Sequence, residues 1–115
     1  MEHLGSIAEG EKFVFESLKR LQPGGIAIHT TEYNVSSNTE TLETGGVVLF
    51  RRRDLESLSQ KLIDAGHHID IDFTLGKDSV DCIVQQPPYQ PDLHLRIQIG
   101  PFIATSFGLI ITKAR

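Results

Sequence analysis

The sequence has 115 residues, of which 39% are hydrophobic and 23% charged, and a formal net charge of −4. That length fits one domain with a modest core, and the acidic balance argues against nucleic acid or an anionic membrane as the main partner. Cys82 is the only cysteine, which excludes an intrachain disulfide and a multi-cysteine zinc site. From this cysteine usage we expect a cytoplasmic protein, and with no secretory leader and no run of about 18 apolar residues we expect it to be neither secreted by that signal nor membrane-spanning.

The first predicted element is a helix over residues 6–21. Ser6 and Glu9 have the spacing of a capping box, in which each side chain binds a free backbone N–H group of the first turn. The helix has one apolar stripe, formed by Val14, Leu18 and Leu21. The Pro-Gly-Gly turn at residues 23–25 ends it, because proline cannot continue a helix and glycine tolerates positive φ. We expect the stripe to pack on a sheet.

Residues 25–31 predict a short strand that is apolar on both sides until His29. This pattern is typical of an interior parallel strand with helices on both faces. Residues 34–46 are rich in Ser, Thr, Asn and Gly, and they predict a loop of a length that is often functional. A second helix is expected over residues 54–65, with an apolar stripe and Gly66 just past its end.

The second half of the chain predicts further extended segments. Residues 67–73 alternate apolar and polar side chains, which indicates a strand with one buried and one exposed face. Residues 82–84 suit a short buried segment, with Cys82 packed as a small apolar residue. Residues 93–99 predict a strand or an extended arm, and residues 102–112 are apolar enough for a central strand. The order of these elements predicts half of an α/β sheet.

Three motifs carry a resemblance to a known family. They are EHLGS at residues 2–6, LQPGG at residues 21–25 and IAIHTTEYN at residues 26–34. In this order they resemble the second half of a class I S-adenosylmethionine-dependent methyltransferase. The resemblance implies a partial Rossmann-like methyltransferase sheet over residues 1–115, with helices packed on it. It also implies that the last strand lies antiparallel between residues 25–31 and residues 67–73.

The same resemblance implies a transferase that uses S-adenosyl-L-methionine to methylate a small-molecule acceptor. Such folds hold their cofactor with a glycine-rich turn after the first strand, and no G-x-G pattern follows a strand in this sequence. We therefore expect the cofactor-binding half to lie outside the chain, and the chain alone to be inactive. The outer edge of residues 25–31 then lacks its usual partner strand, which predicts a homodimer, another homo-oligomer or association with the missing N-terminal half.

The candidate site lies around the carboxyl end of residues 25–31, where open α/β sheets collect ligands. His29 is the candidate catalytic base, because its unperturbed pKa of about 6.5 lets it accept a proton at neutral pH. Glu32 is expected to orient His29 or to bind a cationic group. By resemblance, the cofactor-binding positions are Glu2 and His3, and the substrate-binding positions are Thr30, Thr31 and Tyr33. The alternatives are a frayed N-terminus and an ordinary hydrogen-bonded histidine.

Two other polar clusters predict structural roles. The three arginines at residues 51–53 suit a planar anion, but a solvated rim paired with Asp54 and Glu56 is the favoured interpretation. The His and Asp side chains at residues 67–72 predict a polar outer face and no metal site. The reason is that neighbouring side chains on one face of a strand are about 6.6 Å apart, and side chains at this spacing rarely coordinate one metal ion by themselves.

Three functional hypotheses follow. The first is the C-terminal portion of a methyltransferase. The second is a non-catalytic half-fold module that self-associates or completes its sheet with a partner. The third is an unrelated small α/β hydrolase or binding protein that uses His29 and Glu32. This last hypothesis ranks below the others, because no G-x-S-x-G nucleophile motif is present.

Overall fold

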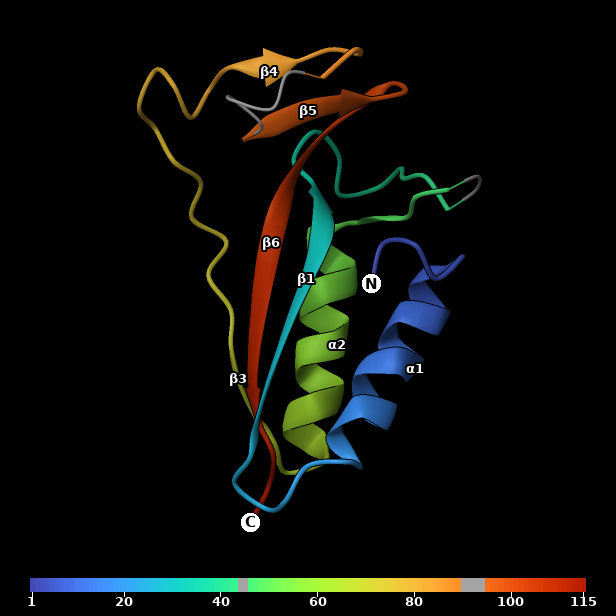
Figure 1. Ribbon diagram of the computed structural model, residues 1–115, viewed down its shortest axis with the longest axis vertical. Helices are drawn as coiled ribbons and strands as arrows, with labels where there is room; N and C mark the ends of the chain where they lie inside the picture. Colours follow the sequence, from blue (N-terminus) through green and yellow to red (C-terminus); the bar gives the residue numbers. More distant parts are fainter. Residues whose placement is uncertain (44–45, 90–94) are drawn as a thin grey trace.

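The computed structural model describes residues 1–43, 46–89 and 95–115. Its helices are α1 (Ile7–Leu18) and α2 (Arg52–Asp64), and its strands are β1 (Ile26–Asn34), β2 (Leu49–Phe50), β3 (His68–Asp70), β4 (Val84–Gln85), β5 (Arg96–Ile99) and β6 (Phe102–Thr112). The six strands of this part of the chain form one open, mixed sheet in the order β2-β1-β6-β5-β4, and β3 also pairs with β6. The α/β class predicted from the sequence is confirmed (Figure 1). No helix in the described ranges has the length and apolar character needed to cross a bilayer.

The long C-terminal strand β6 forms the centre of the sheet. It runs antiparallel to β1 along the whole of β1, with Ile28 opposite Ile110. On its other edge, β6 pairs antiparallel with β3 at residues 110–112 and with β5 at residues 102–105. The predicted antiparallel position of the last strand, between the strand after α1 and the strand after α2, is confirmed. A slip of one residue would move the fully buried Ile111 out of the core, which explains why this register is stable.

Both helices lie next to the same face of the β1–β6 pair (Figure 1). Leu109 and Ile111 face the helices and are fully buried, whereas Ile110 between them is 45% exposed. On β1, Ile28 is 70% exposed on the same open side. The expectation that helices cover both faces of residues 25–31 is therefore wrong for the described part of the chain. The physical reason is that α2 leads from β2 to β3 across the side that α1 already occupies.

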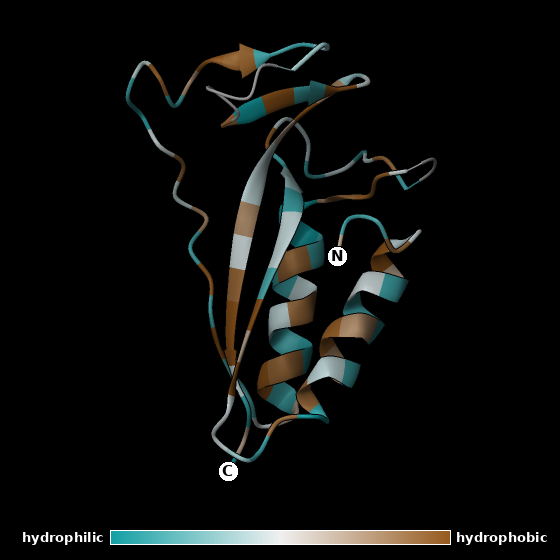
Figure 2. Cartoon of the chain, in the orientation of Figure 1, coloured by the Kyte–Doolittle hydropathy of each residue, from teal (hydrophilic) through white to brown (hydrophobic). Residues whose placement is uncertain are grey.

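The core fills the space between the two helices and this face of the sheet. Leu55, Leu58 and Leu62 recur every three or four residues along α2, and all three are fully buried. Figure 2 shows apolar segments on both helices and along β6. The buried cluster consists of Val14, Leu18, Tyr33, Val48, Phe50, Leu55, Leu58, Leu62, Phe107, Leu109 and Ile111. Removal of these side chains from water is the main favourable contribution to folding.

Specific hydrogen bonds start both helices. Ser6 Oγ accepts the N–H of Glu9, so Ser6 is confirmed as the N-cap of α1. At the start of α2, Asp54 Oδ2 accepts the backbone N–H of Arg51. These bonds satisfy N–H groups that the first turn of a helix leaves without an internal partner.

Two sequence expectations in the second half differ from the structure. The strand expected over residues 67–73 is limited to β3, because only residues 68–70 pair with β6. Cys82 is exposed instead of buried, because it lies in a turn before β4 and outside the core. Of the strand or arm expected over residues 93–99, residues 96–99 form strand β5, Leu95 lies in a bend before it, and residues 93–94 lie outside the described residues.

Candidate functional site

The predicted site residues 29–33 lie within β1 and not in a loop after it. The strand continues to Asn34, because its whole length pairs with β6. Successive side chains of a strand point to opposite faces. The residues on the helix side are His29, Thr31 and Tyr33, and those on the open side are Thr30 and Glu32. The structure therefore does not bring the candidate catalytic residues together.

His29 lies between β1 and α1. Its Nε2 atom is 3.0 Å from Ser17 Oγ, and that hydroxyl donates its own hydrogen to the carbonyl of Val14. From this network we assign the hydrogen to Nε2, so the neutral ring keeps its lone pair at Nδ1. The Phe13 ring contacts the imidazole edge-on, with centroids 5.4 Å apart. Burial, followed by the Met1 ammonium, lowers the pKa of His29 from 6.5, so the ring is mainly neutral at pH 7.

Thr31 and Tyr33 are buried on the same side of β1 as His29. The Tyr33 ring packs against Phe73 and Phe107, at centroid distances of 5.9 and 5.1 Å. Thr31 Oγ1 is buried and has no hydrogen-bond partner within the described ranges. A buried hydroxyl without a partner costs free energy.

The first residues of the chain lie against the outer edge of β1. The Met1 ammonium is 3.0 Å from Glu2 Oε2 and 3.4 Å from the carbonyl oxygen of Thr30. His3 Nδ1 is 2.6 Å from the carbonyl oxygen of Gly46. Burial raises the pKa of Glu2, but its own backbone N–H and the Met1 ammonium outweigh this effect and lower the pKa overall. Glu2 and His3 thus have defined contacts beside a predicted substrate-binding residue.

The loop after β1 is held by the side chain of Asn34. Its Oδ1 atom accepts hydrogen bonds from the N–H and Oγ of Ser36 and from the N–H of Ser37, and its Nδ2 donates to the carbonyl of Glu40. Asn34 is buried, so these bonds are shielded from water. Together with other bonds, such as that from the N–H of Arg53 to Asn38 Oδ1, the Asn34 amide orders the first part of the predicted loop, whereas residues 44–45 lie outside the described residues.

The arginines at the start of α2 pair as the sequence predicts. Arg51 Nε is 2.8 Å from Asp54 Oδ2, and its hydrogen bonds to this carboxylate raise the pKa of Arg51. Arg52 Nε is 3.0 Å from Glu56 Oε1, and its guanidinium carbon lies 4.5 Å from the centroid of the Phe73 ring. The predicted pairing with Asp54 and Glu56 is confirmed. The guanidinium groups of Arg51 and Arg52 are therefore already paired within the chain.

Two adjoining hollows lie on the open side of the sheet, and sequence reasoning missed both. The larger has a volume of about 440 Å³ and is lined by Ile28, Asp70, Ile71, Asp72, Gly108 and Ile110. The smaller, about 300 Å³, shares Asp72 and Gly108 with it and extends to Asp81 and Arg96. No local sequence signal could have found them, because their lining comes from segments far apart in the chain.

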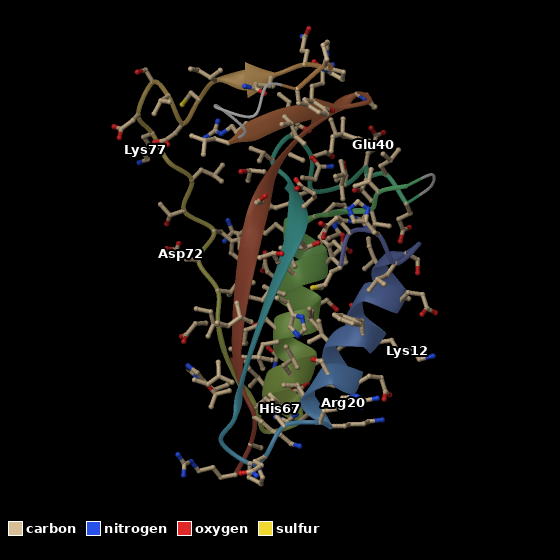
Figure 3. The ribbon with its side chains drawn as sticks, in the orientation of Figure 1. Lys12, Arg20, Glu40, His67, Asp72 and Lys77 are labelled. Carbon is tan, nitrogen blue, oxygen red and sulfur yellow. The ribbon has the colours of Figure 1, made fainter. Side chains whose placement is uncertain are left out.

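Asp72 lies where the two hollows meet. Figure 3 shows it across the sheet from α1, whose Lys12 points away from the strands. The N–H of Thr74 donates a 2.8 Å hydrogen bond to the Asp72 carboxylate and lowers its pKa. Nearby, Asp70 is 3.2 Å from His68 on the polar outer face that the sequence predicts. In the part of the chain that the structure describes, no three or more His, Cys, Asp or Glu side chains are grouped to hold a metal ion.

Comparison with known proteins does not place the chain in a family. No protein-family model, no curated protein and no solved structure matches it.

Proposed function

We propose that this chain is the acceptor-side portion of a class I S-adenosylmethionine-dependent methyltransferase that methylates a small molecule. The observation that supports this most is the position of β6, which runs antiparallel between β1 and β3, with Ile110 opposite both Ile28 and Asp70. The resemblance implies this arrangement for the closing strand. The order of the elements also agrees, since α1 precedes β1 and α2 precedes β3.

The described residues do not form a complete cradle for S-adenosylmethionine. The Glu2 carboxylate is already paired with the Met1 ammonium, and the His3 ring contacts the carbonyl of Gly46. The proposal therefore assigns most of cofactor binding to a half of the fold that lies outside this chain. Glu2 and His3 keep at most a peripheral role in it, beside Thr30.

In this proposal, His29 accepts the proton that the acceptor loses as its oxygen or nitrogen is methylated. The assigned tautomer supports this role, because Nδ1 is free to take a proton while Ser17 holds Nε2. Thr31 and Tyr33 lie on the same side of β1 and are only 2% and 8% exposed, so in this proposal they support the acceptor site from within the core. Glu32 lies on the other side of β1 and so does not orient His29. Glu32 and Thr30 both lie on the open face of the sheet.

The test compares the 115-residue chain with the product of the complete reading frame that contains it. We expect calorimetry to show no binding of S-adenosylhomocysteine by the chain and clear binding by the complete product, because a glycine-rich turn is then present. Release of S-adenosylhomocysteine in the presence of small alcohols, amines and carboxylic acids then identifies the acceptor class. A complete product that binds no S-adenosylhomocysteine overturns the proposal.

The assignment of His29 has its own test in the complete product. His29→Gln should lower kcat by at least about 100-fold, because a positioned base contributes that much or more to a proton transfer. His68→Gln is the matched control, since His68 is exposed on the outer face, and it should leave kcat unchanged. Equal rates for His29→Gln and the unchanged protein would remove His29 from the mechanism.

A second candidate function is a non-catalytic half-fold that works by association. It is favoured by the outer edge of β1, which within the described ranges pairs with β2 only at Glu32 and Tyr33. An edge of this kind offers backbone groups to another strand. Analytical sedimentation at micromolar concentration tests it, and a homodimer or larger assembly of the chain alone is the expected result. In both candidates the protein acts in the cytoplasm.

A further inference from the structure

The open face of the sheet carries an uncovered row of large apolar side chains. Ile26, Ile28 and Ile110 lie on this face, and all three are more than 40% exposed. On the other face, the neighbouring Leu109 and Ile111 are fully buried beneath the helices. A contiguous row of exposed large apolar side chains makes this face a candidate contact surface.

From this face we infer a docking site for an amphipathic α-helix of a partner polypeptide, whose apolar stripe is flanked by lysine or arginine. The inference does not depend on methyl transfer, since it concerns only the contact surface. It rests on the spacing and shape of the face, on its charge, and on the lack of a matching helix in the part of the chain that the structure describes.

The spacing and shape of the face suit a helix laid along the strands. Ile26 and Ile28 are two residues apart on one strand, which separates them by about 6.6 Å, and residues i and i+4 of a helix are separated by about 6 Å along its axis. Beside Ile110, the hollow of about 440 Å³ has Gly108 in its lining. A Cβ atom added at Gly108 would meet no atom within 4 Å, so the surface is recessed there. One apolar side chain of the helix fits this recess.

The charge of the face selects a basic partner. Asp70 and Asp72 line the same hollow as Ile28 and Ile110, and no lysine or arginine lines it. The hydrogen bond from the N–H of Thr74 lowers the pKa of Asp72, which favours its ionised form. His68 Nε2 is 3.2 Å from Asp70 Oδ1, and Arg96 lines the adjoining hollow, where it donates to the carbonyl of Gly76. Lysine or arginine on the docked helix would pair with the two carboxylates.

A second copy of the chain does not supply the required helix. Each described helix exposes one large apolar side chain, Phe13 on α1 and Ile63 on α2, and one side chain does not make a stripe. In a symmetric contact of two open faces, Asp70 and Asp72 of one copy would face the same residues of the other copy. The hollow has no lysine or arginine in its lining to pair with these carboxylates. The partner is therefore a different polypeptide segment.

The experiment uses a fluorescein-labelled synthetic peptide of about 18 residues, long enough to form a helix, with leucine on one face and lysine on the other. Its matched partner has glutamate in place of lysine. We expect fluorescence anisotropy to show that the leucine–lysine peptide binds at least about 10-fold more tightly than the leucine–glutamate peptide. Equal binding of the two peptides overturns the charge argument and with it the proposal.

Variants of the chain locate the contact. The double change Ile28→Ser with Ile110→Ser should weaken binding of the leucine–lysine peptide by about 10-fold or more, because it removes apolar contacts from the face. The double change Phe13→Ser with Ile63→Ser is the control, since it removes exposed apolar side chains elsewhere, and it should leave binding within about 2-fold. If the control weakens binding as much as the open-face variant does, the docking site is not on this face.

Two further measurements complete the test. Gly108→Leu should fill the hollow and weaken binding without loss of folding, because the position has ordinary backbone angles and open space around it. Circular dichroism checks that each variant keeps its fold. Sedimentation of the chain with and without Ile28→Ser tests whether two copies meet through this face, and we expect the change to leave the oligomeric state unaltered. If the chain forms a dimer and Ile28→Ser dissociates it, a second copy occupies the face and the assignment of a partner helix is overturned.

Discussion

His29 Nε2 lies 3.0 Å from Ser17 Oγ, so a histidine in the middle of β1 is hydrogen-bonded to the third turn of α1. This contact orients the imidazole and sets which nitrogen carries the hydrogen. It also places His29 in the layer between helix and sheet, on the face opposite Glu32. A residue that the sequence marks as a candidate base is therefore also part of the packing between α1 and β1.

Stability should depend on pH through His29. Burial lowers the pKa of His29 in the folded chain below its ordinary value of 6.5, so the unfolded chain binds the proton more readily. Its contribution to stability is thus fully present above pH 6.5 and is lost as the pH falls through the lowered pKa. Urea unfolding between about pH 7 and pH 5 should show this loss, and His29→Gln should reduce it. A pH dependence that His29→Gln leaves intact would assign the effect to other groups.

The partly buried ion pair at the start of α2, between Arg51 and Asp54, should matter far more than the exposed pair beside it. Asp54→Ala leaves the guanidinium and backbone N–H of Arg51 without their carboxylate partner, so we expect a loss of about 2–3 kcal/mol in the free energy of unfolding. Glu56→Ala breaks the exposed pair with Arg52 and should cost less than about 0.5 kcal/mol. Chemical denaturation measures both values, and equal losses would contradict the difference in burial.

The same substitution should have opposite effects at two glycines. Gly10 lies in α1, where alanine is normally about 1 kcal/mol better than glycine, but a Cβ atom there would be 2.6 Å from the buried ring of Phe50. We therefore expect Gly10→Ala to destabilise the fold by about 1–3 kcal/mol. Gly108→Ala meets no atom within 4 Å and should be neutral or slightly stabilising.

Thermal unfolding of the two glycine variants decides this prediction. Phe50→Leu in the Gly10→Ala background should recover part of the loss, because it shortens the side chain that the new methyl group meets. A Gly10→Ala variant as stable as the unchanged chain would show that Phe50 can move at little cost.

The loop after β1 should open when Asn34 is shortened. Asn34→Ala removes an acceptor of three hydrogen bonds and a donor of one, all made by a buried amide, and should cost about 2–3 kcal/mol. Limited proteolysis should then cut faster within residues 35–43. Asn38→Ala is the control, because Asn38 is exposed and accepts only the N–H of Arg53, and cleavage should change little. Unchanged cleavage in Asn34→Ala would show that groups other than the Asn34 side chain keep the loop ordered.

The sequence by itself determined the order and type of the main elements. The spacing from Ser6 to Leu18 predicts α1, the leucines of α2 predict the second helix, and the apolar run at residues 102–112 predicts the central strand. These predictions depend on local periods and end signals, which the sequence displays directly. The pairing of Arg51 with Asp54 was predictable for the same reason, since the two residues are close in the chain.

Only the tertiary structure decided where β1 ends and which faces its residues occupy. The polar run after Ile28 suggests a loop, but pairing with β6 holds it in the strand as far as Asn34. That pairing places His29 and Glu32 on opposite faces of the sheet. Because α1 and α2 both cover the same face, Ile28 and Ile110 on the other face stay exposed. The reason is that strand pairing and the choice of a covered face depend on contacts between segments about 80 residues apart, and local sequence patterns carry no information about them.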